Sequence, residues 1–291
     1  MKNFFVLFFL FIFIPSVSVA DMIIGSETVY YVVKGDTFEL IGAKLGINWR
    51  NIVKENNIDV KKTLKIGQEF RVNTRKIVPK IIDDGIIINI PDRMLYLFKE
   101  GKLANAFPVG LGMPSWRGIT HWRTPEGKFK VIGKEKNPTW YVPKSIQIEM
   151  ETKGQPVKTV VPPGTDNPIG RYAVKITIPG ILIHETIWPT SVYQFRSHGC
   201  IRALPQNMEI FFKEVEINTS GEIIYSPIKV AISTEGKVFL EVHKDIYGKM
   251  KDLSVEARGL IEKAGVADKV NWLKVDIILE EKSGIAEDIT S

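Results

Sequence analysis

The sequence of 291 residues contains one cysteine, Cys200, so an intrachain disulfide framework is excluded. Beyond the N-terminal segment, no apolar run reaches the ~20 residues that a membrane-spanning helix needs. The net charge is only +6, and no lysine–arginine block or aromatic–basic stripe stands out. We therefore do not expect nucleic acid as a partner. With 44% hydrophobic and 25% charged residues, the composition is that of an ordinary globular protein.

The N-terminal segment departs from this composition. Lys2 precedes an apolar run over residues 4–14, and small residues follow up to Ala20. This pattern predicts a secretory signal peptide over residues 1–20, with cleavage before Asp21. An uncleaved membrane anchor is the alternative, although the run is shorter than the ~20 residues of a spanning helix. We expect export and no membrane span after cleavage.

Residues 28–74 are predicted to form a small module in the order strand, helix, helix, strand. Asp36 or Thr37 can cap the first helix, and Gly46 can end it. The expected elements are a strand over 29–33, helices over 38–45 and 48–55, and a closing strand over 70–72.

From about residue 82 the pattern becomes rich in short β-strands. Glu100-Gly101 and Glu235-Gly236 supply two hairpin turns, and proline- and glycine-rich loops, including residues 137–146, separate the strands. This predicts a mainly β domain, sandwich- or barrel-like, with few helices.

Two helices are expected in the second half of the chain. Pro205 suits a first helical position, and a second helix is expected over residues 254–264. The apolar face of the first helix contains Met208, Phe211, Phe212 and Val215. We expect the C-terminal extension, residues 244–291, to pack on the main domain through Trp272, Val275, Ile278 and Leu279.

The lone Cys200 allows four interpretations: an intermolecular disulfide, a metal ligand, an inert buried residue or a reactive thiol. Nothing in the sequence supports the disulfide. A zinc-protease motif would need a second histidine where Trp188 stands, and no second cysteine is present. We therefore expect no metal and no cofactor. A reactive thiol needs a base, and His184 and His198 are the candidates.

Geometry favours His184 as the base of a reactive Cys200. His184 ends a predicted strand, from which its side chain can be aimed, whereas His198 is two residues from Cys200 on a tight loop. Gly199 allows a sharp bend, and backbone N–H groups around it can hold an oxyanion. Arg202 can bind a substrate carboxylate through its guanidinium fork.

Two parts of the chain resemble known families. "YVVKGDT", "IVKENNI" and "LKIGQEFRV" resemble a LysM module over residues 28–74, and "IHETIWPTSVYQFRSHGCIR" resembles the signature of the YkuD-type L,D-transpeptidase catalytic domain. We assign that domain to residues 82–243. The order of signal, LysM and catalytic domain is typical of periplasmic wall enzymes.

The resemblance implies a mechanism. Cys200 would be the nucleophile and His184 the general base, forming a thioester with a peptidoglycan tetrapeptide stem. Ser197, His198, Gly199, Arg202 and Thr186 would shape the oxyanion hole and bind substrate. The LysM module would bind glycan strands, and the acceptor amine would belong to another stem peptide or to a wall-attached lipoprotein.

Two alternatives stay open. The same scaffold can act as an L,D-carboxypeptidase or cross-link hydrolase when water is the acceptor, and a wall-binding protein with a decayed site is a third class. The sequence departs from the family at Glu185, where a glycine is usual. We expect that carboxylate to add negative charge near the thiolate, which would weaken the thiol or select a substrate that carries an amine.

Overall fold

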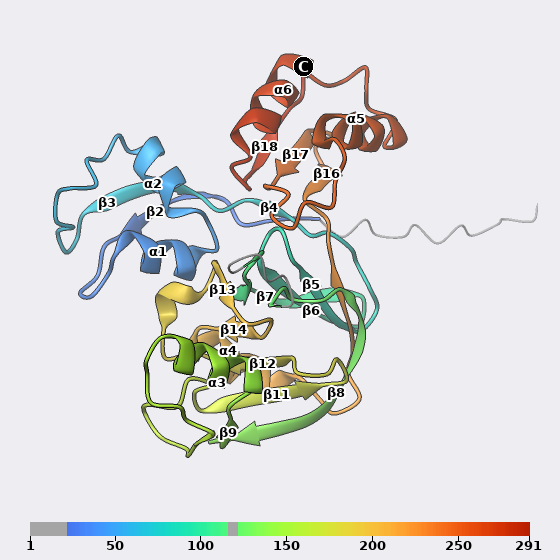
Figure 1. The fold of residues 1–291 in the computed structure, drawn as a ribbon. Helices are drawn as coiled ribbons and strands as arrows, with labels where there is room; N and C mark the ends of the chain where they lie inside the picture. Colours follow the sequence, from blue (N-terminus) through green and yellow to red (C-terminus); the bar gives the residue numbers. More distant parts are fainter. Residues whose placement is uncertain (1–21, 116–121) are drawn as a thin grey trace, which may run out of the picture.

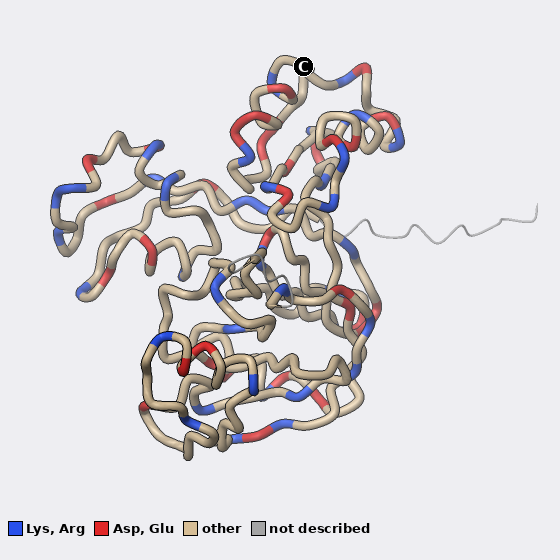
Figure 2. Tube along the Cα trace, viewed as in Figure 1, with Lys and Arg blue, Asp and Glu red and all other residues tan. Residues whose placement is uncertain are grey.

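The computed structural model describes residues 22–115 and 122–291. The predicted signal peptide, residues 1–20, lies outside the described residues. Figure 1 shows three units in chain order, with the N-terminal and C-terminal units both beside the central β-rich one. Acidic and basic residues are interspersed over all three (Figure 2). Within the described part of the chain, no helix has both the length and the apolar character to cross a membrane.

The N-terminal unit confirms the expected order of strand, helix, helix, strand. Thr37 caps α1 by accepting a hydrogen bond from the Leu40 N–H at 3.2 Å, and Gly46 ends α1 in the left-handed conformation. Asn48 caps α2 in the same way. The elements are β2 (Glu27–Tyr31), α1 (Phe38–Leu45), α2 (Trp49–Glu55) and β3 (Glu69–Asn73).

The first strand of this unit ends earlier than the sequence predicts. The Val33 N–H donates to Asp36 Oδ2 at 2.9 Å, and this turn leads the chain away from β3 towards α1. Asp36 is therefore a turn residue, and Thr37 is the cap.

The central unit is a sheet that closes on itself. Its strands follow the spatial order β13-β7-β14-β12-β11-β8-β15-β5-β6, and β6 also pairs with β7. This confirms a mainly β, barrel-like domain. The strands are β5 (Gly85–Asn89), β6 (Met94–Lys99), β7 (Lys102–Gly112), β8 (Gly127–Lys136), β11 (Tyr172–Ile176), β12 (Leu182–Glu185), β13 (Phe195–Ser197), β14 (Ile201–Ala203) and β15 (Ser220–Ile224).

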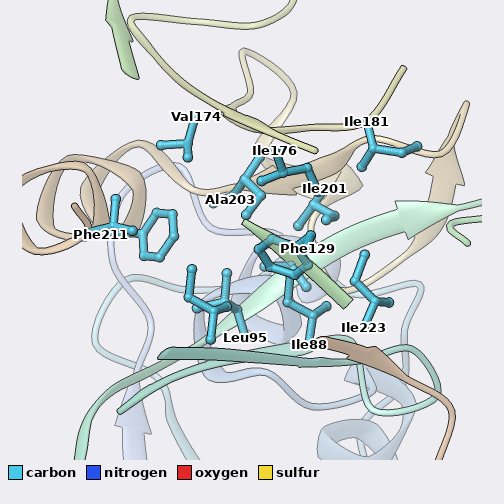
Figure 3. Packing of buried hydrophobic residues seen from close by; sticks show 14 of the residues in the cluster. Ile88, Leu95, Phe129, Val174, Ile176, Ile181, Ile201, Ala203, Phe211 and Ile223 are labelled. Atoms are coloured by element: carbon cyan, nitrogen blue, oxygen red, sulfur yellow. The ribbon is translucent and has the colours of Figure 1, made fainter. Parts of the chain in front are cut away.

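The core of this sheet receives the apolar face of α4 (Pro205–Glu214). Phe211 points from the helix towards Leu95 and Phe129 of the strands (Figure 3), and all three are buried. Pro205 is the first residue of the helix, as the sequence predicts.

A segment between β8 and β11 carries a helix that the sequence did not reveal. The expected proline-rich loop over residues 137–146 instead contains β9 (Trp140–Tyr141) and the start of α3 (Lys144–Thr152). No residue of α3 is buried, and Ile146 and Met150, four residues apart, form a narrow apolar face that is only half-buried. The strand β10 (Val160–Val161) pairs with β9, and the short helix η1 (Pro189–Ser191) follows β12.

The C-terminal unit is built around the hairpin that the sequence analysis placed in the main domain. The strands β16 (Ile228–Ile232) and β17 (Val238–Val242) form a sheet with β18 (Ala286–Asp288), apart from the barrel. The helices α5 (Leu253–Lys263) and α6 (Trp272–Glu281) cover this sheet. Val275, Ile278 and Leu279 thus pack against the hairpin rather than against the barrel core.

Candidate active site

A cavity of about 400 Å³ lies where β12, β13 and β14 meet α3. The side chains on its wall that bear on chemistry are His184, His198, Cys200 and Arg202, and the apolar ones include Trp122, Trp188, Ile146 and Met150. Ser197 lies on the same wall, so the chain brings together five of the predicted site residues.

Strand pairing positions the thiol and the histidine of β12. β12 and β14 run parallel, with Ile183 opposite Ile201 and His184 opposite Arg202. Cys200 immediately precedes β14, so residues of both strands reach the same cavity. Two rigid strands thus fix the relation between the predicted nucleophile and the predicted base.

His184 is 4% exposed, and its Nδ1 lies 2.6 Å from the carbonyl oxygen of Glu185. A carbonyl only accepts, so Nδ1 carries the proton and donates it. Burial and the nearby charge of Arg202 lower the pKa of His184 to about 4. The imidazole is consequently neutral near pH 7, with a lone pair on Nε2 available to accept a proton.

Cys200 is also neutral at rest. Burial raises the pKa of its thiol, although Arg202 and the Leu182 backbone oppose that rise. The Sγ–H donates to the Gly180 carbonyl at 3.6 Å. The resting site therefore holds a thiol and an imidazole rather than an ion pair, and a proton must move before the sulfur can attack.

The loop before Cys200 is held by its own hydrogen bonds. Ser197 Oγ donates to the Cys200 carbonyl at 2.6 Å and accepts from the Gly199 N–H at 3.1 Å. Gly199 has φ 107°, and a Cβ there would lie 2.9 Å from Ile181 Cδ1, so glycine is required. Because the Gly199 N–H is occupied, it is not free to bind the oxyanion that the sequence analysis assigned to it.

Arg202 presents an unneutralised cation to the cavity. Its buried Nε has no hydrogen-bond partner among the described residues, and its guanidinium lies 5.5 Å from the ring centre of Trp188. No described carboxylate forms an ion pair with it. A substrate carboxylate fits such a group.

Thr186 is not among the residues of the cavity wall. It is buried, its Oγ1 accepts from the Trp188 N–H at 3.1 Å, and its own N–H donates to the Ala203 carbonyl at 3.2 Å. Its bonds shape the loop that carries Trp188, one step removed from the site.

His198 has a partner that the sequence analysis missed. Its Nε2 lies 2.6 Å from Oε2 of Glu149 on α3, and its ring packs edge-on against Trp122 with 4.1 Å between centres. Burial lowers the pKa of His198, whereas Glu149 opposes that shift. A charged residue on an exposed helix gives no sequence signal of such a role.

Glu185 does not lie near the thiol as the sequence analysis expected. Successive residues of a strand point to opposite faces, so Glu185 points away from the cavity that His184 enters. Its Oε1 accepts from Arg171 Nε at 3.2 Å, and its side chain fills the space where Gly170 lacks a Cβ. Its charge does not contribute to the pKa shift of Cys200. The expectation of a weakened thiolate was therefore wrong.

A second cluster of ionisable groups lies between the units. Asp92, Glu241 and His243 present ligand atoms within 4.8 Å of one another, and all three residues are buried. The Lys229 ammonium lies 2.7 Å from Asp92 Oδ2 and 2.9 Å from Glu241 Oε1. A lysine cation already neutralises the carboxylates that a metal would need.

The sequence matches two family models and several known proteins. The family model of the L,D-transpeptidase catalytic domain (YkuD) matches residues 83–232, and that of the LysM domain matches residues 30–73. The probable L,D-transpeptidase YcfS of Escherichia coli is 26% identical over 90% of this chain and 84% of its own length. The probable L,D-transpeptidase YbiS of the same species is 28% identical over 77% and 72%.

Solved structures include the C442S mutant of the Enterococcus faecium L,D-transpeptidase, which is 25% identical over half of each chain with a TM-score of 0.35. The family model alone covers more than half of the sequence. The chain belongs to the L,D-transpeptidase family of YkuD type and carries a LysM domain before its catalytic domain.

Proposed function

We propose that the protein is a cysteine-dependent L,D-transpeptidase that acts on peptidoglycan tetrapeptide stems. The observation that carries this proposal is a neutral thiol and a neutral imidazole on the wall of one cavity. His184 Nε2 takes the thiol proton as Cys200 Sγ attacks the carbonyl carbon between the diamino acid and the terminal D-alanine. The tetrahedral intermediate collapses, the D-alanine amine leaves with the proton from His184, and a thioester remains.

The charge of the cavity supports a stem peptide as the donor. Arg202 is a cation without a described carboxylate partner, and the described residues of the cavity wall include no aspartate or glutamate. A stem peptide carries carboxylates at its terminal D-alanine and at its side chains. Arg202 binds one of these, and the Cys200 N–H holds the oxyanion.

The remaining assignments concern place and partners. We assign residues 28–74 to a glycan-binding LysM module, 82–243 to the catalytic domain and 244–291 to an extension. Within the catalytic domain the barrel strands end at Ile224, and the hairpin of β16 and β17 packs with the extension. Residues 1–20 are the signal for export to the periplasm, where the LysM module retains the enzyme on the wall. The acceptor amine comes from another stem peptide or from a wall-attached lipoprotein.

Intact-mass analysis with ertapenem tests the nucleophile. A solved Enterococcus faecium catalytic domain is described as acylated by this carbapenem. We expect one adduct on the wild-type chain and none on Cys200→Ala, with circular dichroism confirming that both are folded. A folded wild type without an adduct, or an adduct that persists in Cys200→Ala, rejects the assignment.

Product analysis separates transferase from hydrolase. The protein, given disaccharide-tetrapeptide, should yield cross-linked dimer as well as D-alanine. Tripeptide as the sole product favours the carboxypeptidase alternative, in which water attacks the thioester. Binding to the wall is tested by pelleting Cys200→Ala with purified peptidoglycan, and protein that stays in the supernatant counts against the LysM role.

A further inference from the structure

His198 and Glu149 form a pair that acylation of Cys200 does not use. His184 supplies the base for that step, yet a second histidine lines the same cavity with a carboxylate 2.6 Å from its Nε2. We propose that this pair serves the second half-reaction: Glu149 attracts the acceptor ammonium, and His198 takes its proton. The inference rests on the proposed acyl-transfer function and names the residues that select its acceptor.

The two histidines differ in what surrounds them. Burial and the cation of Arg202 disfavour an imidazolium at both histidines, and the Nδ1–H of His184 faces only a neutral carbonyl. His198 faces a carboxylate, which favours its protonated form. Of the two, His198 is therefore better suited to hold a proton taken from a cationic substrate.

The charge of Glu149 suits the acceptor. An amine acceptor arrives as an ammonium ion, while the cavity wall itself contributes Arg202 and no carboxylate. Glu149 lies directly behind His198, and its second oxygen already binds an ammonium, that of Lys153. Lys153 is about half exposed, with 48% of its side chain accessible, so solvent screens its charge and the charge of Glu149 acts on the cavity through His198.

The helix that carries Glu149 is placed to act on the cavity. No residue of α3 is buried, but Ile146 and Met150 form part of the cavity wall. Glu149, next to Met150, has only 13% of its side chain exposed and reaches the loop of Cys200 through His198. Glu149 is thus a partly buried carboxylate on the side of α3 that faces the cavity.

Aminolysis of the thioester moves two protons. The acceptor ammonium gives one proton to His198, which releases it to solvent, and the neutral amine nitrogen attacks the thioester carbon. The tetrahedral intermediate loses a second proton from nitrogen as the C–S bond breaks. That second proton ends on Cys200 Sγ, so an amide and a free thiol are formed.

The experiment measures how the acyl-enzyme partitions between acceptors. The full chain receives disaccharide-tetrapeptide with either Nα-acetyl-lysine amide, which is cationic at neutral pH, or hydroxylamine, which is uncharged. Glu149→Gln keeps the size of the side chain and removes its charge. Glu151→Gln removes the same charge from an exposed position of the same helix and is the matched control.

We expect Glu149→Gln to lower the ratio of lysine-amide aminolysis to acylation by about tenfold, which is less than the ~10²–10⁴-fold of a general base because His198 is still present. The corresponding ratio for hydroxylamine should fall much less, and His198→Gln should follow Glu149→Gln. Glu151→Gln should match the wild type with both acceptors.

Other results overturn the inference. An unchanged ratio in Glu149→Gln, with normal ertapenem acylation, rejects the acceptor role and leaves the proposed function intact. An equal loss with both acceptors assigns Glu149 to the structure of the cavity wall instead. A wild type that ertapenem does not acylate rejects the proposed function itself, and the acceptor role with it.

Discussion

Two histidine–glutamate pairs of this protein share one geometry and differ in everything around it. His198 lies 2.6 Å from Glu149, and His243 Nε2 lies 2.6 Å from Oε1 of Glu241. The first pair borders an open cavity, whereas the second is buried where the barrel meets the C-terminal sheet. The same pair therefore stands in two different surroundings, one next to a cavity and one almost without contact with solvent.

The buried pair has its hydrogen-bonding capacity committed. Glu241 accepts from the Ile77 N–H at 2.5 Å, and Lys229 bridges Glu241 to Asp92. Ile77 belongs to β4 (Lys76–Ile77), which pairs with β1 (Ile23–Ile24), so the cluster joins the N-terminal segment, the barrel and the C-terminal sheet. In contrast, His198 of the other pair lines an open cavity, and the second partner of its glutamate, Lys153, is half exposed.

The largest effect is expected from removing the proposed base. His184→Gln should slow ertapenem acylation about 10²- to 10⁴-fold, because no neutral imidazole then takes the thiol proton. His243→Gln, which lies outside the cavity, should acylate at close to the wild-type rate when folded. Time-resolved intact-mass analysis measures both rates. Equal rates for the two variants would mean that the cavity histidine is not the base.

Breaking the buried cluster should have the next largest effect. Lys229→Met leaves Asp92 and Glu241 without their shared cation, which should cost about 3–5 kcal/mol of stability. Lys237→Met is the matched control, since Lys237 is 53% exposed in its pair with Asp288 and should change stability by less than about 1 kcal/mol. Urea unfolding measures the difference. Similar urea midpoints for Lys229→Met and Lys237→Met would mean that the buried cluster does not stabilise the fold.

The sequence predicted the parts of the site whose signals are local. The proline at position 205 marks the start of α4, and the motif around Cys200 identifies the thiol and its neighbours. The direction of Glu185 was also within reach, because strand alternation sends it opposite His184. The error came from treating neighbours in sequence as neighbours in space.

Long-range contacts were out of reach. Glu149 meets His198 across 49 residues, and Ile146 and Met150 give α3 too short an apolar repeat to identify a packed helix. The hairpin of β16 and β17 gains its third strand from the end of the chain. A turn between two short strands predicts a hairpin, but the sheet that the hairpin joins depends on long-range packing, which the local sequence does not specify.

Acid should weaken the fold through the buried histidines. The pKa of His243 and that of His184 are each lowered to about 4 from an unfolded value of 6.5, so between those values the unfolded chain binds more protons. Stability is therefore complete above pH 6.5 and falls as the pH drops towards 4, by up to about 3 kcal/mol per histidine. The lowered pKa of Glu241, about 2, extends the loss below pH 4.5.

Thermal unfolding between pH 7.5 and 4 checks this slope. His243→Gln should make the dependence of stability on pH less steep, because glutamine does not titrate. The slope that remains belongs largely to His184. A flat profile in the wild type would show that both imidazoles titrate as they do in the unfolded chain, against their burial.

The smallest effect is expected from an exposed ion pair at the same junction of units. Lys54 of α2 lies 2.6 Å from Glu281 of α6, with 70% and 39% of the side chains exposed. Water and salt screen such a pair, so a double-mutant cycle of Lys54→Ala and Glu281→Ala should give a coupling of less than about 1 kcal/mol that shrinks in high salt. A coupling energy as large as the stability loss expected for Lys229→Met would mean that exposure to solvent does not decide how much an ion pair stabilises this protein. Both the Lys54–Glu281 pair and the Lys229 cluster join the C-terminal unit to the rest of the chain. When the exposed pair is broken, water solvates the carboxylate that is left, whereas the carboxylates of the buried cluster have no access to water.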